Sequence, residues 1–328
     1  MDPQSATDTP KTANHPDPEF AIETLGLSKT YRPEKNEAPV QALNNVSLKI
    51  PRGSFFGLLG PNGAGKSTFI NILAGLVKKT SGEARIWDYD IEKDMRNARL
   101  AIGIVPQELN IDPYFTPREL LDVQAGLYGV PKAERRTEEV LDAIGLADKA
   151  NAYTRALSGG MRRRLLVGKA MVHSPPVLVL DEPSAGVDVD MRRQLWQRVS
   201  DMNRSGTTVL LTTHYLEEAQ ALCDTIAIID HGNLIACQST KDLLARLDSK
   251  EMIIRVDQDV AQIPDTLDGL KIEIRNAREL IVLYPPSKIH SGDILHRVQA
   301  AGLGVLDIST KEAELEDIFL NLTGKPRQ

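Results

Sequence analysis

Residues 60–67 read Gly-Pro-Asn-Gly-Ala-Gly-Lys-Ser, which fits the pattern GxxxxGK[ST]. The apolar run before this loop, Ser54–Leu59, is typical of a strand, and Ser67–Leu73 after it has helical periodicity. Glycines let the backbone wrap around a polyphosphate with main-chain N–H groups pointing inward, and a helix N-terminus adds a partial positive charge. The segment therefore predicts a phosphate-binding loop between a strand and a helix.

This loop supplies most of the expected nucleotide-binding residues. Lys66 can reach the β and γ phosphates of a nucleotide, and the Ser67 hydroxyl can bind Mg²⁺. The residues expected to contact the nucleotide here are Gly60, Pro61, Asn62, Gly63, Ala64, Gly65, Lys66, Ser67 and Thr68.

Short apolar runs alternate with helical patterns up to about residue 247, which predicts an α/β core with a parallel sheet. The expected strands are Gly53–Gly60, Ile102–Val105, Val177–Asp181, Thr208–Thr212 and Thr225–Ile229. The expected helices are Ser67–Leu76, Pro117–Leu127, Arg135–Ile144, Gly159–Val172, Met191–Asn203 and Leu216–Leu222.

The domain organisation follows from changes in pattern along the chain. Residues 1–19 are polar and proline-rich, which predicts a disordered tail. We expect a nucleotide-binding domain over 20–247, with a helical subdomain inserted at about 110–172. Residues 248–328 change to mixed strands and helices, which predicts a small C-terminal α+β domain, but they show no recognisable chemistry.

Composition excludes several classes of function. The formal net charge of −6 gives no support to nucleic-acid binding, because such proteins normally carry a basic surface. The two cysteines lack the spacing of a zinc site. The sequence contains no apolar run long enough to span a bilayer and no signal peptide at its start, so we expect membrane contact only through a partner.

Two adjacent carboxylates follow the apolar run Val177–Leu180. Asp181 and Glu182 are expected at the carboxyl end of a parallel strand, which is where open α/β sheets bind ligands. Asp181 would bind Mg²⁺ through its water shell, and Glu182 would orient and deprotonate an attacking water. The pair is a weak signal by itself and gains weight beside the phosphate loop.

A second candidate anion site is Leu157-Ser-Gly-Gly-Met161, which precedes three arginines. A hydroxyl, bare backbone N–H groups and a helix N-terminus suit an anion, although Ser158 alone could be an ordinary helix cap. Arg163 and Arg164 could equally form a solvated helix face.

Together these motifs resemble the nucleotide-binding subunits of ABC transporters, over roughly residues 21–247. The phosphate loop resembles the Walker A motif, Leu157–Met161 the signature sequence, and Val177–Glu182 the Walker B strand with its catalytic glutamate. Met161 stands where the family often has Gln, a side chain that is not the phosphate ligand. The remaining family positions are matched by Tyr31 (adenine stacking), Gln107 (Q-loop), Asp188 (D-loop) and His214 (switch histidine).

The resemblance implies an ATPase that works as a homodimer around two ATP molecules with Mg²⁺. Ser158, Gly159 and Gly160 of one copy would contact the ATP held by Lys66 of the other. Catalysis would involve Glu182, His214, Gln107 and Lys66, and the metal ligands would be Ser67, Gln107 and Asp181. Asp188 would also lie at the nucleotide.

A finer likeness is to drug and polysaccharide exporters of the daunorubicin-resistance-like group. It rests on four segments, 158–165, 181–188, 212–219 and 314–324. It implies export through a separate integral-membrane permease and a peripheral location at the cytoplasmic face of the inner membrane. The alternative is a soluble ABC-type ATPase that acts without a permease as an assembly or regulatory factor.

Overall fold

The computed structural model describes residues 17–32, 38–184, 189–245, 250–264, 267, 269–312 and 315–323. The chain divides into two compact units, one of residues 1–214 and 229–234 and the other of residues 215–228 and 235–328. Among the described residues, no helix is both long and apolar enough to cross a bilayer.

The described residues of the first unit form most strands of the main sheet, a second sheet and six α-helices. Its strands are β1 (Phe20–Tyr31), β2 (Val40–Pro51), β3 (Phe55–Leu59), β4 (Ser81–Ile86), β5 (Tyr89–Asp90), β6 (Ile102–Val105), β7 (Val177–Asp181) and β8 (Thr208–Thr212). Its α-helices among the described residues are α1 (Lys66–Leu73), α2 (Met95–Leu100), α3 (Pro117–Leu127), α4 (Thr137–Ala143), α5 (Gly159–Met171) and α6 (Val189–Arg204). Short 3-10 helices are η1 (Lys132–Glu134), η2 (Ala147–Lys149) and η3 (Thr154–Ala156).

The main sheet has the strand order β10-β9-β3-β8-β7-β6, where β9 (Thr225–Asp230) and β10 (Asn233–Ser239) have residues in both units. Strands β3, β8, β7 and β6 run parallel. Every residue of β3 and β8 is buried, and only the last residue of β7 is partly exposed. Such continuous burial is expected of strands that are covered on both faces, and the predicted parallel α/β core is confirmed.

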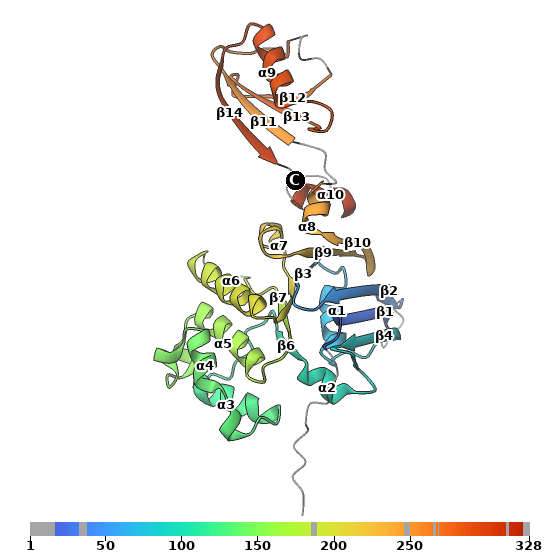
Figure 1. The fold of residues 1–328 in the computed structure, drawn as a ribbon, viewed down its shortest axis with the longest axis vertical. Coiled ribbons are helices and arrows are strands. Elements are labelled where there is room, and N and C mark those ends of the chain that lie inside the picture. The colour runs from blue at the N-terminus through green and yellow to red at the C-terminus, as the bar shows by residue number, and fades with distance from the viewer. Residues whose placement is uncertain are drawn as a thin grey trace, which may run out of the picture. The chain divides into compact units, whose positions relative to one another are not determined.

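The second sheet of this unit was not predicted. Strands β2-β1-β4-β5 form an antiparallel sheet, and helix α1 contacts both this sheet and β7 (Figure 1). The strand-like alternation of apolar and polar residues in β1 is limited to its start, Phe20–Leu25. Its alternation breaks at Gly26, where φ is 60° and the register with both neighbouring strands shifts.

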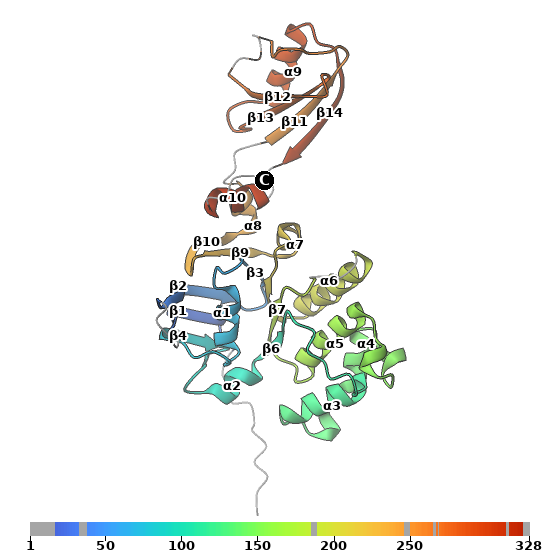
Figure 2. The ribbon, with the colours of Figure 1, turned by 180° about the vertical axis from the view of Figure 1, so that it is seen from behind.

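Helices α3, α4 and α5 pack on one another, in the stretch where a helical subdomain was expected (Figure 2). Their apolar side chains form one buried cluster that includes Leu121, Leu141 and Leu165. Helix α3 has the predicted bounds, and its first turn carries a capping box between Thr116 and Glu119. Helix α1 ends earlier than predicted, at Leu73, before Gly75 turns the backbone left-handed with a φ of 69°.

The second unit contains a small α+β structure, in agreement with the predicted fold class. Its elements are α7 (Leu216–Leu222), α8 (Thr240–Ala245), β11 (Lys250–Val256), β12 (Lys271–Arg275), β13 (Glu279–Tyr284), α9 (Ser291–Ala300), β14 (Val305–Glu312) and α10 (Leu315–Thr323). Strands β12-β13-β11-β14 form an antiparallel sheet. Ile294 and Val298 of α9 belong to the same buried cluster as Ile254 and Val282 of the sheet.

Candidate active site

The phosphate loop connects β3 to α1, and two of its glycines, Gly60 and Gly65, lie too close to other backbone atoms to carry a side chain. A Cβ atom on Gly60 would lie 2.2 Å from the carbonyl oxygen of Ile229, and one on Gly65 would lie 2.4 Å from that of Ala42. Gly65 has a φ of 111° and caps α1, where no side chain of the described residues accepts from the helix. The first turn of α1 therefore presents main-chain N–H groups that a ligand can use.

Lys66 begins α1 and is buried inside the curve of this loop. Its Nζ donates to the carbonyl oxygens of Gly60 at 2.6 Å and Pro61 at 3.1 Å. Burial lowers the pKa of the Lys66 ammonium, while the charges of Glu182 and Asp181 act in the opposite direction. Because an ammonium group has three donors, two carbonyls leave one available for a phosphate oxygen.

Asp181 ends β7 and is held by the neighbouring strand β8. Thr212 Oγ1 donates to Asp181 Oδ1 at 2.5 Å. Burial raises the pKa of the Asp181 carboxyl, and the Thr212 bond and the charge of Lys66 partly offset that effect. A carboxylate oxygen at this depth is a suitable ligand for a hard cation.

Glu182 follows with a left-handed backbone, since its φ is 47°. Its N–H donates to the carbonyl oxygen of Thr212 at 3.0 Å and to the Thr212 hydroxyl at 3.2 Å, which anchors this unusual conformation. Gln107 Nε2 donates to Glu182 Oε2 at 2.8 Å, and His214 Nδ1 lies 3.5 Å from the same oxygen. Two predicted residues, Gln107 and His214, thus converge on the carboxylate of a third, Glu182. The three follow neighbouring parallel strands, β6, β8 and β7.

The sequence allowed two roles for Arg163, as part of an anion site or as part of a solvated helix face. The structure shows a third role, as a buried hydrogen-bond donor to backbone carbonyls. The side chain is only 4% exposed, and NH1 donates to the carbonyl oxygens of Pro106 at 2.9 Å and Gln107 at 2.8 Å. Burial lowers the pKa of the guanidinium, opposed by Asp181 and Glu182. Its spacing from Val167 and Ala170 on the buried face of α5 could have indicated this position.

Arg164 is likewise buried, at 9% exposure, so the solvated helix face that the sequence left open does not apply to Arg163 or Arg164. The burial is supported by carbonyl acceptors at the end of α4, since Arg164 NH1 donates to Ile144 O at 2.9 Å. A buried guanidinium needs such acceptors.

The signature segment lies at the N-terminus of α5. Ser158 is the helix cap, and its Oγ accepts from the N–H of Met161 at 3.2 Å. Ser158 and Gly159 are exposed and Gly160 is half-buried. No hydrogen bond among the described residues joins Ser158 to the cluster around Glu182, so its role toward a nucleotide stays a prediction.

The remaining predicted residues are spread around the loop and the strand ends. Tyr31 ends β1 with 40% of its surface exposed, and Lys29 Nζ lies 4.7 Å from the centre of its ring. Ser67 is exposed and Thr68 half-buried in the first turn of α1. Asn62 and Gly63 are exposed in the loop. Asp188 lies outside the described residues.

Comparison with known proteins identifies this arrangement. A family model described as "ABC transporter" matches residues 43–185. The linearmycin resistance ATP-binding protein LnrL of Bacillus subtilis is 36% identical over 297 residues, which cover 86% of this chain and 94% of that protein. The chain belongs to the ABC transporter family.

Other members of the ABC transporter family agree with this assignment. The daunorubicin/doxorubicin resistance ATP-binding protein DrrA of Streptomyces peucetius is 35% identical over 94% of each chain. A solved dimeric ATP-binding cassette in a post-hydrolysis state, bound to ADP and Pi, superposes with a TM-score of 0.60 at 28% identity. The superposition covers 67% of this chain and 98% of the solved cassette. The predicted family and fold class are confirmed.

Proposed function

We propose that this chain is the ATP-hydrolysing subunit of an ABC exporter, and that two copies close around two ATP molecules to drive export through a separate permease. The observation that carries the proposal is the convergence of Gln107 and His214 on Glu182, next to Asp181 and the phosphate loop. The resistance ATP-binding relatives and the dimeric cassette support it.

The residues of the site suit a triphosphate and an attacking water. N–H groups of the loop and the free donor of Lys66 would bind the β and γ phosphates. Glu182 would accept a proton from the water, and Gln107 and His214 would fix the direction of its carboxylate. Tyr31, with its ring partly exposed, would stack on the adenine.

The site also fits a magnesium ion. The Ser67 hydroxyl, the Asp181 carboxylate and the amide oxygen of Gln107 are hard oxygen donors of the kind that Mg²⁺ prefers. The amide nitrogen of Gln107 is the atom bonded to Glu182, which leaves its oxygen for the metal. When bound, Mg²⁺ would neutralise charge on the phosphate oxygens.

The second half of each site would come from another copy. Ser158 and Gly159 are exposed on this chain, and with Gly160 they offer a hydroxyl and main-chain N–H groups to the γ-phosphate of the partner's ATP. Asp188 would act at the same interface. Contact with a permease would place the chain peripherally at the cytoplasmic face of the inner membrane. Co-purification of the chain with a multispanning membrane protein tests this location.

Substitution Glu182→Gln tests the hydrolytic function. The amide keeps the size of the side chain but cannot accept the proton, so steady-state ATP hydrolysis is expected to fall at least about a hundredfold. ATP binding should persist, and the variant should accumulate as an ATP-bound dimer. The exposed Glu217→Gln serves as a control and should hydrolyse ATP normally. Undiminished turnover in Glu182→Gln would refute the assignment.

A further inference from the structure

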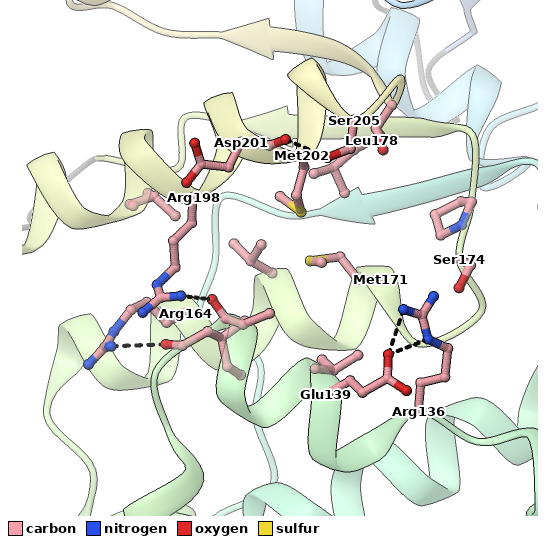
Figure 3. Close-up of a pocket in the computed structure, with 17 residues that line it drawn as sticks. Arg136, Glu139, Arg164, Met171, Ser174, Leu178, Arg198, Asp201, Met202 and Ser205 are labelled. Carbon is pink, nitrogen blue, oxygen red and sulfur yellow. Dashed lines mark hydrogen bonds and ion pairs between the residues drawn. The ribbon is translucent and has the colours of Figure 1, made fainter.

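A cavity of about 410 Å³ lies between α4, α5, β7 and α6, all within the first unit (Figure 3). None of its lining residues belongs to the candidate active site. The apolar part of the lining consists mainly of Val140, Ile144, Val167, Met171, Leu178 and Leu195. Its volume falls in the range of sites that hold small organic ligands.

One end of the cavity carries two guanidinium groups (Figure 3). Arg164 NH1 donates to the carbonyl oxygens of Ile144 at 2.9 Å and Gly145 at 3.1 Å, and Arg198 NH1 donates to that of Ala143. A Cβ atom on Gly145 would lie 2.8 Å from Arg164 and 3.1 Å from Arg198. Both cations therefore gather around the carbonyl end of α4.

Carboxylates of the cavity do not neutralise this pair. Within the part of the chain that the structure describes, Glu139 pairs with Arg136 at 2.6 Å and Asp201 with Arg204 at 3.0 Å. Figure 3 shows the Arg136–Glu139 pair at the opposite end from Arg164 and Arg198. The carbonyl end of a helix carries only about half a negative charge, so the end with two arginines keeps a net positive charge.

Two details show that the charge of Arg164 is incompletely compensated. Its side chain is nine-tenths buried, and its Nε atom has no hydrogen-bond partner among the described residues. Burial first, and then repulsion from Arg198, lowers the pKa of Arg164, with Asp148 acting in the opposite direction. A buried donor without an acceptor is unfavourable unless a ligand supplies one.

We propose that this cavity binds a small amphipathic carboxylate, with its apolar body against α5 and β7 and its headgroup between Arg164 and Arg198. A carboxylate matches the planar donor arrangement of guanidinium groups. Two carboxylates of the lining, Glu139 at the opposite end and Asp201 one turn along α6 from Arg198, disfavour polyanions such as nucleotides. The occupant would contact α4 and α5 together with α6, and the inference does not depend on ATP hydrolysis.

Titration calorimetry with decanoate, in the absence of nucleotide, tests the proposal. The full-length protein is expected to bind one decanoate per chain. Arg198→Gln should weaken binding about tenfold, since it removes one charged donor from the headgroup. Arg198 is exposed, so this variant should fold normally. Arg193→Gln, an exposed arginine of α6 outside the cavity lining, is the matched control and should bind like the wild type.

A second pair of measurements separates the headgroup from the apolar body. Decanol should bind at least about tenfold more weakly than decanoate to the wild type. Val167→Phe, which fills the cavity and keeps both arginines, should abolish decanoate binding. The proposal fails if decanoate does not bind, if decanol binds equally well, or if Arg193→Gln weakens binding as much as Arg198→Gln.

Discussion

Thr212 makes hydrogen bonds to both acidic residues of the candidate site. Its hydroxyl donates to Asp181 Oδ1, and the same hydroxyl and its carbonyl oxygen accept from the N–H of Glu182. Glu182 has a left-handed backbone, which is unfavourable for a residue with a side chain and needs such anchoring. Thr212 thus sets where the two carboxylates point, although it would touch neither ATP nor water.

Substitution Thr212→Val removes the hydroxyl and keeps the shape of this fully buried side chain. We expect kcat for ATP hydrolysis to fall about tenfold, since a misplaced carboxylate loses transition-state stabilisation, with little change in KM. Thr208→Val is the matched control, because Thr208 is equally buried at the other end of β8 and bonds to Gly53 instead. Equal losses of kcat in both variants would contradict the positioning role.

The buried carboxyl of Asp181 should make the free energy of unfolding of the nucleotide-free protein depend on pH. Burial raises the pKa of its carboxyl in the folded chain. For a raised carboxyl pKa, stability is greatest below the unfolded-state pKa and is lost as the pH rises through the folded-state pKa. Ionised Asp181 is therefore destabilising at neutral pH when no cation is bound.

Asp181→Asn should accordingly raise the free energy of unfolding of the nucleotide-free protein at pH 8. The gain should shrink between pH 8 and pH 4, because protonation of the wild-type carboxyl removes its burial penalty. Urea denaturation of both proteins at the two pH values measures this difference. Lower stability of Asp181→Asn at pH 8 would show that burial is not the dominant effect on this group.

At the scale of elements, Arg163 ties α5 to the segment that follows β6. Its guanidinium bonds to the carbonyl oxygens of Pro106 and Gln107, and the Gln107 side chain in turn bonds to Glu182. One arginine therefore connects helix α5, which begins directly after Ser158, with the segment whose Gln107 side chain bonds to Glu182.

Arg163→Gln is expected to lower the free energy of unfolding by about 2 kcal/mol, the range for hydrogen bonds that involve a charged group. It should also reduce kcat, because Gln107 loses its anchor. Replacement of the exposed Arg96 by Gln serves as the control for loss of charge. Chemical denaturation and steady-state ATPase assays check both effects, and an unchanged kcat would argue that Arg163 is purely structural.

The sequence predicted elements well where burial is continuous or follows a helical period, and poorly where only a few residues are buried. The apolar runs of β7 and β8 and the amphipathic α3 have the predicted bounds. Strand β4, in contrast, buries only Ala84 and Ile86, so its sequence carries almost no strand signal. The motif residues around Glu182 could be found because their types and order are distinctive. The roles of Thr212 and Arg163 could not, because they depend on contacts across strands and helices.

At the scale of the whole molecule, the two candidate ligand-binding segments, 60–68 and 157–161, differ in exposure. Lys66 is buried within its loop, whereas Ser158 is exposed at the start of α5, where its hydroxyl accepts from the N–H of Met161 in the same helix. If a second copy supplies the acceptor for Ser158, ATP binding to Lys66 and dimerisation become separable properties. The proposed dimer predicts that a substitution of Ser158 leaves ATP binding intact and abolishes ATP-dependent dimerisation.

The most direct measurement is the mass in solution of the Glu182→Gln protein, with and without ATP. The same measurement is made on the double variant that also carries Ser158→Arg. The proposal predicts that ATP converts Glu182→Gln into a dimer with two bound ATP molecules. The double variant should bind one ATP per chain and show no ATP-dependent dimer, because the arginine blocks the partner's γ-phosphate. An ATP-dependent dimer of undiminished stability in the double variant would contradict the claim that Ser158 contacts the nucleotide of the other copy.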